Sequence, residues 1–337
     1  MTRNELVFSA SEGHPAFVVD HSTADKGIYL ENIRAALAGA TFKAYAGALA
    51  RFSEWCNSEG RAAVPATPGT IAAYIGQLER EGRKAATILQ AVAGIAKAHR
   101  VAGVENPCSS EQVRAAVRAM KRRVGVAPKQ KAAATTDVLQ TIVAGIDGKT
   151  LLGKRDRALL LCGFAGAFRR SELVALRLGD LNQTTDDTGR AVIEVTVRRS
   201  KTDQTGEGMV KALFAAHKKN AAFCPVRALR EWIAAAGLTD PEAPLFPRVL
   251  KGDHLSASEA LAPQAVALVL KKRAAAAGVE LDLAGHSLRR GFVTSAISAG
   301  ASERSIMYQT GHKSPLMVRR YIERHNAVTD NAAALLG

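Results

Sequence analysis

Residues 124–134, VGVAPKQKAAA, carry no apolar periodicity and separate two stretches that do. A mixture of Pro, Gly, Lys and Ala favours neither a buried helix nor a strand. The length of 337 residues also exceeds the size at which a single core usually keeps growing. The sequence therefore predicts a flexible arm over 1–27, a helical domain over 28–123, a linker over 124–134 and a second domain over 135–337.

The N-terminal part has apolar residues at three- and four-residue spacing, the pattern of amphipathic helices. One helix is predicted to begin at Thr41, a fair N-cap, and another to follow Thr67 and stop near Gly82. Two more are centred on the apolar positions of 88–96 and 113–120. Helices of this kind predict a small all-α bundle.

The second domain is predicted to be helical with one small antiparallel sheet. A helix is expected from Thr136, and a strongly apolar one over 158–167. Alternating residues over 192–199 predict a strand, and 210–214 is its expected partner. After Pro225 the pattern is again mostly helical. The fold class is therefore mainly α: a helical bundle followed by an α+β domain.

Positive charge is spread over the whole chain. The 46 Lys and Arg exceed the 31 Asp and Glu, for a net charge of +15. Residues 1–133 contribute +7 and residues 134–337 contribute +8. A protein that grips nucleic acid from two sides has this distribution, and a merely soluble basic protein is the alternative.

A basic face is predicted on the helix around 113–120, at the positions Arg114, Arg118, Lys121 and Arg122. Spacings of four and three place these side chains opposite the apolar face. Such faces are usually just solvated, but this one leads directly into the basic linker. We expect the bundle, the linker and the second domain to wrap a DNA duplex.

Cysteine usage and hydropathy indicate a reduced, cytoplasmic setting, and the expected DNA partner would place the protein at the nucleoid. The four cysteines form no CxxC pair and each lies in or beside an apolar stretch. No signal-peptide pattern and no uncharged apolar stretch of about 20 residues is present, so no membrane partner is expected. No Asp/Glu/His set has metal-ligand spacing, and no metal or other cofactor is expected.

Two segments early in the second domain carry residues suited to phosphate chemistry. Arg169 lies in GAFRRSELVAL with Glu172 one turn on, where the carboxylate pairs well with the arginine. A purely structural ion pair is the alternative. Lys201 lies in RRSKTD at the junction of strand and turn, where an exposed lysine is common. At a hairpin tip, a lysine is also able to protonate a leaving oxygen.

Histidine and arginine follow further along. His286 and Arg289 share one face of a helix predicted to start after Gly285, and His312 follows Gly311 on a turn. Histidine exchanges a proton near neutral pH, and arginine offers a planar fork to phosphate oxygens. Both types are expected around a bound phosphate.

Tyr321 lies in the run RRYIERH, between Arg319 and Arg320 on one side and Arg324 on the other. Cations favour the phenolate form of a side chain that normally loses its proton near pH ~10. The pattern indicates a nucleophile held beside a phosphate.

Together these segments resemble the tyrosine site-specific recombinases, the phage integrase family. The order and spacing agree for an Arg-x-Ser-Glu box, a hairpin lysine, a His-x-x-Arg box, a Gly-His pair and a terminal tyrosine. The resemblance covers about residues 35–330 and, in its N-terminal part, is to the Cre branch. Two positions depart from the pattern: His312 stands where Cre carries tryptophan, and Arg290 where many integrases carry a second histidine. Both changes keep a hydrogen-bond donor.

The resemblance implies a SAM-like core-binding domain and a catalytic domain that form a C-shaped clamp on DNA. It implies that Tyr321 attacks the scissile phosphate and forms a 3′-phosphotyrosyl bond, without ATP or metal. Arg169 and Arg289 would bracket the non-bridging oxygens, with His312 as a third donor.

The remaining roles also come from the resemblance. Lys201 would protonate the departing 5′ oxygen, His286 would transfer a proton and contact the phosphate, and Glu172 would hold the geometry. The residues expected to enter or line the DNA grooves are Lys43, Lys84, Thr87, Gln90 and Gln264. The two lysines are equally suited to contacting only phosphates, and the alternative for Gln90 is a solvated surface position.

The implied assembly is a homotetramer on two double-stranded DNA sites, each with an inverted repeat. The apolar C-terminal stripe (Val328, Ala332, Leu335 and Leu336) is expected to dock on a neighbouring copy, and covering its own core is the alternative. Rival functions are a non-cutting DNA-binding protein and an enzyme like a type IB topoisomerase or telomere resolvase.

Overall fold

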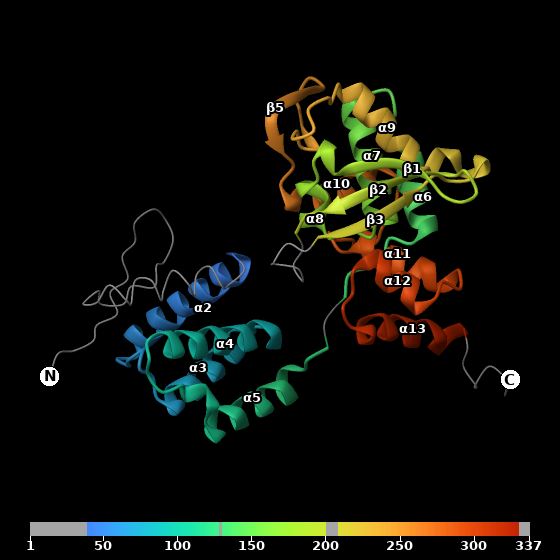
Figure 1. Ribbon diagram of the computed structural model, residues 1–337. Coiled ribbons are helices and arrows are strands. Elements are labelled where there is room, and N and C mark those ends of the chain that lie inside the picture. The colour runs from blue at the N-terminus through green and yellow to red at the C-terminus, as the bar shows by residue number, and fades with distance from the viewer. Residues whose placement is uncertain (1–38, 128–129, 200–207, 330–337) are drawn as a thin grey trace, which may run out of the picture. The chain divides into compact units, whose positions relative to one another are not determined.

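The computed structural model describes residues 39–127, 130–199 and 208–329 (Figure 1). The chain divides into two compact units, Met1–Lys129 and Gln130–Gly337. The expected arm over 1–27 lies outside the described residues. Within the described ranges, no helix combines the length and apolarity needed to cross a membrane.

The first unit is helical, as the sequence predicts. Its elements are α2 (Gly39–Ser58), α3 (Pro68–Arg80), α4 (Ala85–Val101), the 3-10 turn η1 (Pro107–Ser109) and α5 (Glu111–Val124). The expected N-cap at Thr41 is wrong, because Thr41 lies inside α2, which already includes Gly39. The second helix does follow Thr67, whose hydroxyl caps α3 by accepting a hydrogen bond from the Thr70 amide at 3.2 Å.

The core of this unit forms where the apolar faces of α2 to α5 meet. Phe52, Ile71, Ile88 and Met120 come from four different helices, and each is fully buried. Helices α2 and α4 approach closely at Gly94, where an added Cβ would lie 3.4 Å from the backbone of Tyr45. This packing turns the polar faces of α2 and α4 to solvent.

The second unit contains two antiparallel sheets among helices. Its helices are α6 (Thr136–Ala144), α7 (Leu151–Ala165), α8 (Arg170–Ala175), η2 (Leu178–Asp180), η3 (Lys218–Phe223), α9 (Pro225–Ala236), α10 (Pro263–Ala276), α11 (Ser287–Ser298), α12 (Glu303–Thr310) and α13 (Pro315–Thr329). Its strands are β1 (Leu181–Thr185), β2 (Ala191–Val197), β3 (Met209–Phe214), β4 (Pro247–Leu250) and β5 (His254–Ala260).

The expectation of a single sheet is wrong, whereas the chain after residue 225 is mostly helical, as expected. The predicted strands β2 and β3 gain β1 as a third member, in the order β1-β2-β3, and β4 pairs with β5 in a separate hairpin. Strand β5, HLSASEA, is polar and lacks the β-branched and aromatic residues that signal a strand. Its pairing depends on contacts that the local pattern does not reveal.

Helix α7 starts seven residues before the predicted position, Ala158. The Thr150 hydroxyl caps it by accepting from the Gly153 amide at 3.0 Å. The carboxylate of Asp253, at the tip of the β4–β5 hairpin, accepts from the Leu151 and Leu152 amides at 2.7 and 2.8 Å. These contacts stabilise the start of a helix whose residues 153–157, GKRDR, have little apolar periodicity of their own.

Helices α11, α12 and α13 lie together at the end of the unit opposite the β4–β5 hairpin (Figure 1). Val293, Ile306 and Val318 form their shared core, and Tyr321 and Ile322 pack against it. The first two turns of α13 are therefore anchored on their own unit, which fixes the position of Tyr321.

Candidate active site and DNA-contacting surface

The turn between α7 and α8 positions the first arginine. Arg169 precedes α8, and Glu172 in the first turn of that helix accepts from its backbone amide at 2.9 Å and from its Nη1 at 2.6 Å. The Glu172 side chain is 1% exposed and that of Arg169 is 14% exposed. The predicted pair exists, and it orients the guanidinium while capping the helix.

Arg289, on α11, lies against the same turn. Its Nη1 donates to the Ala167 carbonyl at 2.8 Å, and burial, followed by the nearby charge of Arg169, lowers its pKa to about 10. Its Nη2 is buried and has no hydrogen-bond partner among the described residues. An unpaired buried donor on a cation is costly, and an anion bound beside it would remove that cost.

His312 follows the left-handed C-cap of α12 at Gly311. Its Nδ1 lies 2.9 Å from the Thr310 hydroxyl, which donates its own hydrogen to the Ile306 carbonyl at 2.7 Å. Because that hydrogen is engaged, the hydroxyl accepts from Nδ1–H and leaves the lone pair on Nε2. Burial, and then the charges of Arg289 and Arg169, lower the pKa of His312 to about 4. The imidazole is therefore neutral near pH 7.

Tyr321 is half-buried on α13, and its ring faces a different cation from those that the sequence suggested. The Arg290 guanidinium lies 5.9 Å from the ring centroid. Arg319 instead pairs with Glu303 at 3.1 Å, and Arg320 is exposed. The Arg324 side chain lies outside the described residues. Arg290, noted only as a departure from the family pattern, is thus the arginine that contacts the tyrosine.

Electrostatic interactions connect the candidate residues. The charges of Arg169 and Tyr321 both affect the pKa of Arg289, and the charges of Arg289 and Arg169 both lower the pKa of His312. The structure thus brings together residues from the turn before α8, from α11, from the turn after α12 and from α13.

His286 is the exposed N-cap of α11, which starts after Gly285 as predicted. Lys201 lies outside the described residues.

Lys211 is a site residue that motif reasoning missed. Its side chain is fully buried in β3, and its Nζ donates to the Gly166 carbonyl at 3.0 Å and lies 3.6 Å from Glu172 Oε2. Burial lowers the pKa of Lys211 to about 7, against the opposing effect of Glu172. A signal was present: in the predicted strand 210–214, alternation places this lysine on the same face as Leu213.

The predicted DNA-contacting residues of the first unit are exposed. Lys43 lies on α2, Lys84 precedes α4, and Thr87 and Gln90 lie on its first two turns. The basic residues of α5 are exposed as well, namely Arg114, Arg118, Lys121 and Arg122. In the second unit, Gln264 is exposed in the first turn of α10.

Glu111 partly neutralises the basic face of α5. It accepts from Arg114 at 3.2 Å and also pairs with Arg118, both through exposed side chains. Exposed pairs of this kind contribute little and exchange readily with other anions. Lys121 and Arg122 occupy the last turn, where cations are favoured by the helix dipole.

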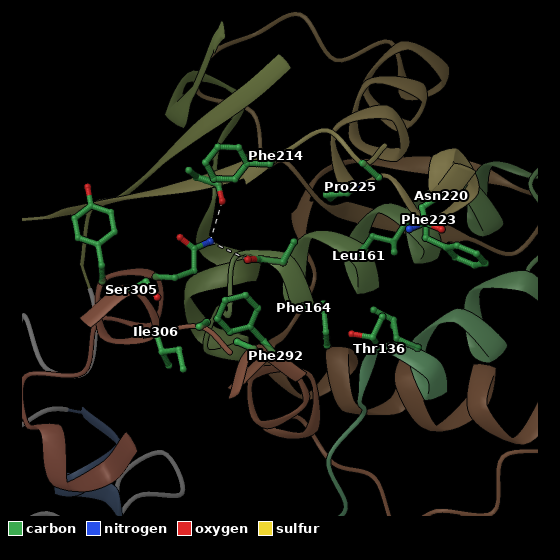
Figure 2. Close-up of a pocket in the computed structure, with 18 of the residues that line it drawn as sticks. Thr136, Leu161, Phe164, Phe214, Asn220, Phe223, Pro225, Phe292, Ser305 and Ile306 are labelled. Carbon is green, nitrogen blue, oxygen red and sulfur yellow. Dashed lines mark hydrogen bonds between the residues drawn. The ribbon is translucent and has the colours of Figure 1, made fainter. Parts of the chain in front are cut away.

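An apolar cavity of about 850 Å³ lies on the second unit, between α6, α7, β3 and α12. Figure 2 shows the rings of Phe164, Phe214, Phe223 and Phe292 around it. Gln309 crosses its wall and donates through Nε2 to the carbonyls of Ala165 and Ala212, each at 2.8 Å. The cavity is large enough to receive several apolar side chains of another segment.

Comparison with known proteins identifies the family. The phage integrase family matches residues 132–327. An integrase/recombinase XerD homolog of Selenomonas ruminantium is 39% identical over 296 residues, which cover 87% of this chain and 84% of that protein. Recombinase Cre of Escherichia phage P1 is 26% identical over 318 residues, covering 90% of this chain and 89% of its own length. The likeness to Cre therefore runs along most of the chain, at lower identity.

Solved structures show the same fold. The Tn1549 transposon integrase, in complex with transposon right end DNA, has a TM-score of 0.57 at 17% identity, covering 92% of this chain and 98% of that one. The XerH recombinase bound to a palindromic difH substrate has a TM-score of 0.54 at 16% identity, covering 83% and 76%. By family and by fold, the chain belongs to the phage integrase family and is a tyrosine recombinase, a site-specific DNA recombinase.

Proposed function

We propose that this recombinase cuts DNA by transferring a phosphodiester to Tyr321. The phenolic oxygen attacks the phosphorus, a bond forms between tyrosine and the 3′ phosphate, and the bond to the 5′ oxygen breaks. The 5′ hydroxyl of a partner strand then reverses these steps. Because the phosphotyrosyl bond conserves the phosphodiester's free energy, rejoining requires neither ATP nor a metal.

The observation that carries this proposal is the buried Nη2 of Arg289, which lacks a hydrogen-bond partner within residues 39–127, 130–199 and 208–329. Arg289 lies beside Arg169, and the repulsion between the two cations contributes to the lowered pKa of Arg289. A phosphate between them would relieve the repulsion, satisfy the buried donor and receive two guanidinium forks. The same cations would stabilise the extra negative charge of the pentacoordinate transition state.

His312 would join this group through Nε2. The imidazole is neutral in the free protein, and the bound anion would raise its pKa towards the protonated form, which donates to a non-bridging oxygen. Glu172 holds Arg169 from the side away from solvent. We assign proton transfer to His286 and protonation of the leaving 5′ oxygen to Lys201, following the family resemblance.

The two units are proposed to form a C-shaped clamp on one duplex. Residues 28–123 would supply a DNA-binding domain, 124–134 a linker and 135–337 the catalytic domain, with an arm over 1–27. The exposed polar faces of α2 and α4 support major-groove reading by Lys43, Lys84, Thr87 and Gln90, and α10 supports a contact by Gln264. The basic face of α5 would hold phosphates.

The assembly proposed is a homotetramer on two inverted-repeat sites, each with arms of roughly 13 base pairs as in the Cre branch. The apolar cavity beside α12 supports it, because the cavity has the chemistry to receive the stripe of Val328, Leu335 and Leu336 from a neighbouring copy. Acting on DNA in this way, the protein is expected to work in the cytoplasm, at the nucleoid.

Removal of one hydroxyl tests the nucleophile. Tyr321→Phe is expected to bind a duplex selected from random DNA as the wild type does, and to form no protein–DNA adduct that survives denaturant. Tyr308→Phe is the matched control, since this exposed tyrosine lies on α12 and is expected to leave the adduct intact. An adduct formed by Tyr321→Phe would overturn the assignment, and failure of the wild type to form one would favour a non-cutting DNA-binding protein.

A further inference from the structure

Lys211 is fully buried, so its ammonium loses its hydration on folding. Strand β3 alternates, so that Val210 and Phe214 are exposed while Lys211 and Leu213 face the core. The residue opposite Lys211 across the sheet is Val195, which is itself fully buried. A buried ammonium is retained only where specific partners offset its lost hydration.

The partners of this ammonium all belong to the turn between α7 and α8 or to the first turn of α8. Nζ donates to the Gly166 carbonyl at 3.0 Å and to the Ala167 carbonyl at 3.3 Å, and it lies 4.7 Å from the Phe168 ring centroid. Glu172 Oε2 lies 3.6 Å away. The ammonium therefore has two hydrogen-bonded carbonyls and one paired carboxylate oxygen, all supplied by this turn and the first turn of α8.

Through these contacts Lys211 connects the two candidate phosphate-binding arginines. Glu172, which faces Lys211 with one oxygen, holds Nη1 of Arg169 with the other. The Ala167 carbonyl, which accepts from Lys211, also accepts from Nη1 of Arg289. Ala167 has a φ of +45°, an uncommon conformation for a residue with a side chain, which costs conformational energy and needs support from its surroundings.

We propose that Lys211 is a positioning residue for DNA cleavage, which ties the carbonyls of the 166–167 turn to Glu172 and thereby sets the spacing between Arg169 and Arg289. This proposal rests on the proposed function of the two arginines in holding the scissile phosphate. Lys211 itself touches neither DNA nor the reacting atoms. It acts through the turn and through the carboxylate.

Charged residues on several elements around the site affect the protonation of Lys211. Glu172 on α8 favours its protonated form, while Arg289 on α11 and Arg169 before α8 oppose it. The charge of Lys211 in turn acts on His312 after α12. Since burial lowers the pKa of Lys211 to about 7, the free protein holds both forms near neutral pH. A phosphate between the arginines would favour the ammonium, so DNA binding would take up a proton.

Stability and cleavage then respond to pH in opposite directions. The pKa of Lys211 is about 7 in the folded protein, whereas a solvated lysine has a pKa of 10.5, so the unfolded chain binds the extra proton between these values. Lys211 therefore makes the folded protein more stable as pH rises from about 7 to 10.5. Cleavage would instead fall on the alkaline side as the ammonium is lost.

The test is single-turnover cleavage of a selected, nicked target duplex by Lys211→Met, with Leu213→Met as the control on the same buried face. Lys211→Met is expected to cleave about 10- to 100-fold more slowly at pH 7.5 at saturating DNA, because the phosphate-binding groups are misplaced. Its DNA affinity should stay within about twofold of the wild type, since most DNA contacts lie elsewhere. As the pH rises above about 7, the cleavage rate of this variant should also fall less than that of the wild type, because it has no Lys211 ammonium to lose.

Wild-type cleavage rate and pH profile in a folded Lys211→Met would overturn the proposal. If that variant does not fold, calorimetry of DNA binding by His312→Gln at pH 8 in two buffers of different ionisation enthalpy decides, because this variant removes proton uptake by His312: proton uptake supports the proposal and its absence overturns it. Failure of the proposed function would look different, because wild-type protein would then form no Tyr321 adduct in the same assay.

Discussion

The Thr310 hydroxyl and the imidazole of His312 lie 2.9 Å apart at the end of α12, and the direction of their hydrogen bond sets the chemistry of the histidine. Since Thr310 donates to the Ile306 carbonyl, it accepts from Nδ1–H of His312. Nε2 then carries the lone pair and faces the proposed contact with phosphate. A neutral local contact thus fixes both the tautomer and the ring orientation of His312.

Loss of this hydroxyl should slow cleavage. Thr310→Val keeps the size of the side chain but removes the acceptor for Nδ1, so the imidazole loses its preferred orientation. Single-turnover cleavage should fall about 10-fold, the equivalent of roughly 1.4 kcal/mol for one hydrogen bond lost at the transition state. Thr310→Ser keeps the hydroxyl and should cleave at close to the wild-type rate. Equal rates for the Val and Ser variants would show that Thr310 does not orient His312.

Stability should decline in mild acid because of His312. Its pKa is about 4 in the folded protein, whereas a solvated histidine has a pKa of 6.5, so the unfolded chain binds more protons between these values. The folded state therefore loses stability as pH falls from about 6.5 to about 4, with no further loss below. Thermal denaturation measured across this range should show a smaller decline for His312→Gln than for the wild type. Identical slopes for the two proteins would contradict the lowered pKa.

The C-terminal segment should drive assembly on DNA. A chain truncated after His325 should still bind a single inverted-repeat arm but should assemble two duplexes at least about 10-fold less well, because the apolar stripe is gone. Phe214→Glu, which places a charge in the cavity wall, should have the same effect. Leu281→Glu changes an equally exposed apolar residue outside the cavity and serves as the control. Sedimentation on DNA measures all three, and unchanged assembly after truncation would indicate that the segment covers its own unit.

Local signals predicted the parts of the structure that depend on neighbours in sequence. The start of α3 after Thr67 and the pair of Arg169 and Glu172 depend on residues three apart, and both appear as expected. Helix periodicity likewise located the apolar faces of α3, α4 and α5. Such features carry their full physical cause within one turn of chain.

Long-range contacts explain what the sequence did not reveal. The early start of α7 depends on Asp253, which lies about one hundred residues away in the chain. The contact of Arg290 with Tyr321 arises only when α13 packs on α11. The partners of Lys211 lie more than 40 residues away, except for Glu172, which is 39 away, so a strand pattern predicts that this lysine is buried without showing what pairs with it. The motif approach finds reacting groups more readily than the residues that hold them in place.

The catalytic unit therefore has two kinds of polar contact around its arginines. Glu172 accepts from Nη1 of Arg169 and the Ala167 carbonyl accepts from Nη1 of Arg289, and these contacts hold the guanidinium groups in place. The Nη2 of Arg289 has no hydrogen-bond partner in the part of the chain that the structure describes. Such a division lets the phosphate enter a site whose cations are already oriented, which limits the reorganisation needed on binding.

Base recognition by α4 provides the remaining prediction. Gln90 is exposed on α4, and a glutamine in the major groove pairs bidentately with adenine. Gln90→Ala should relax the preference at one base position in sites selected from random DNA, by about 1–3 kcal/mol of discrimination. Lys84→Ala is the matched comparison, because a phosphate contact should weaken binding to all sequences alike and reduce the salt dependence by about one counterion. If the sites selected by Gln90→Ala match those of the wild type at every position, Gln90 is a solvated surface residue and recognition by α4 must come from its other exposed side chains.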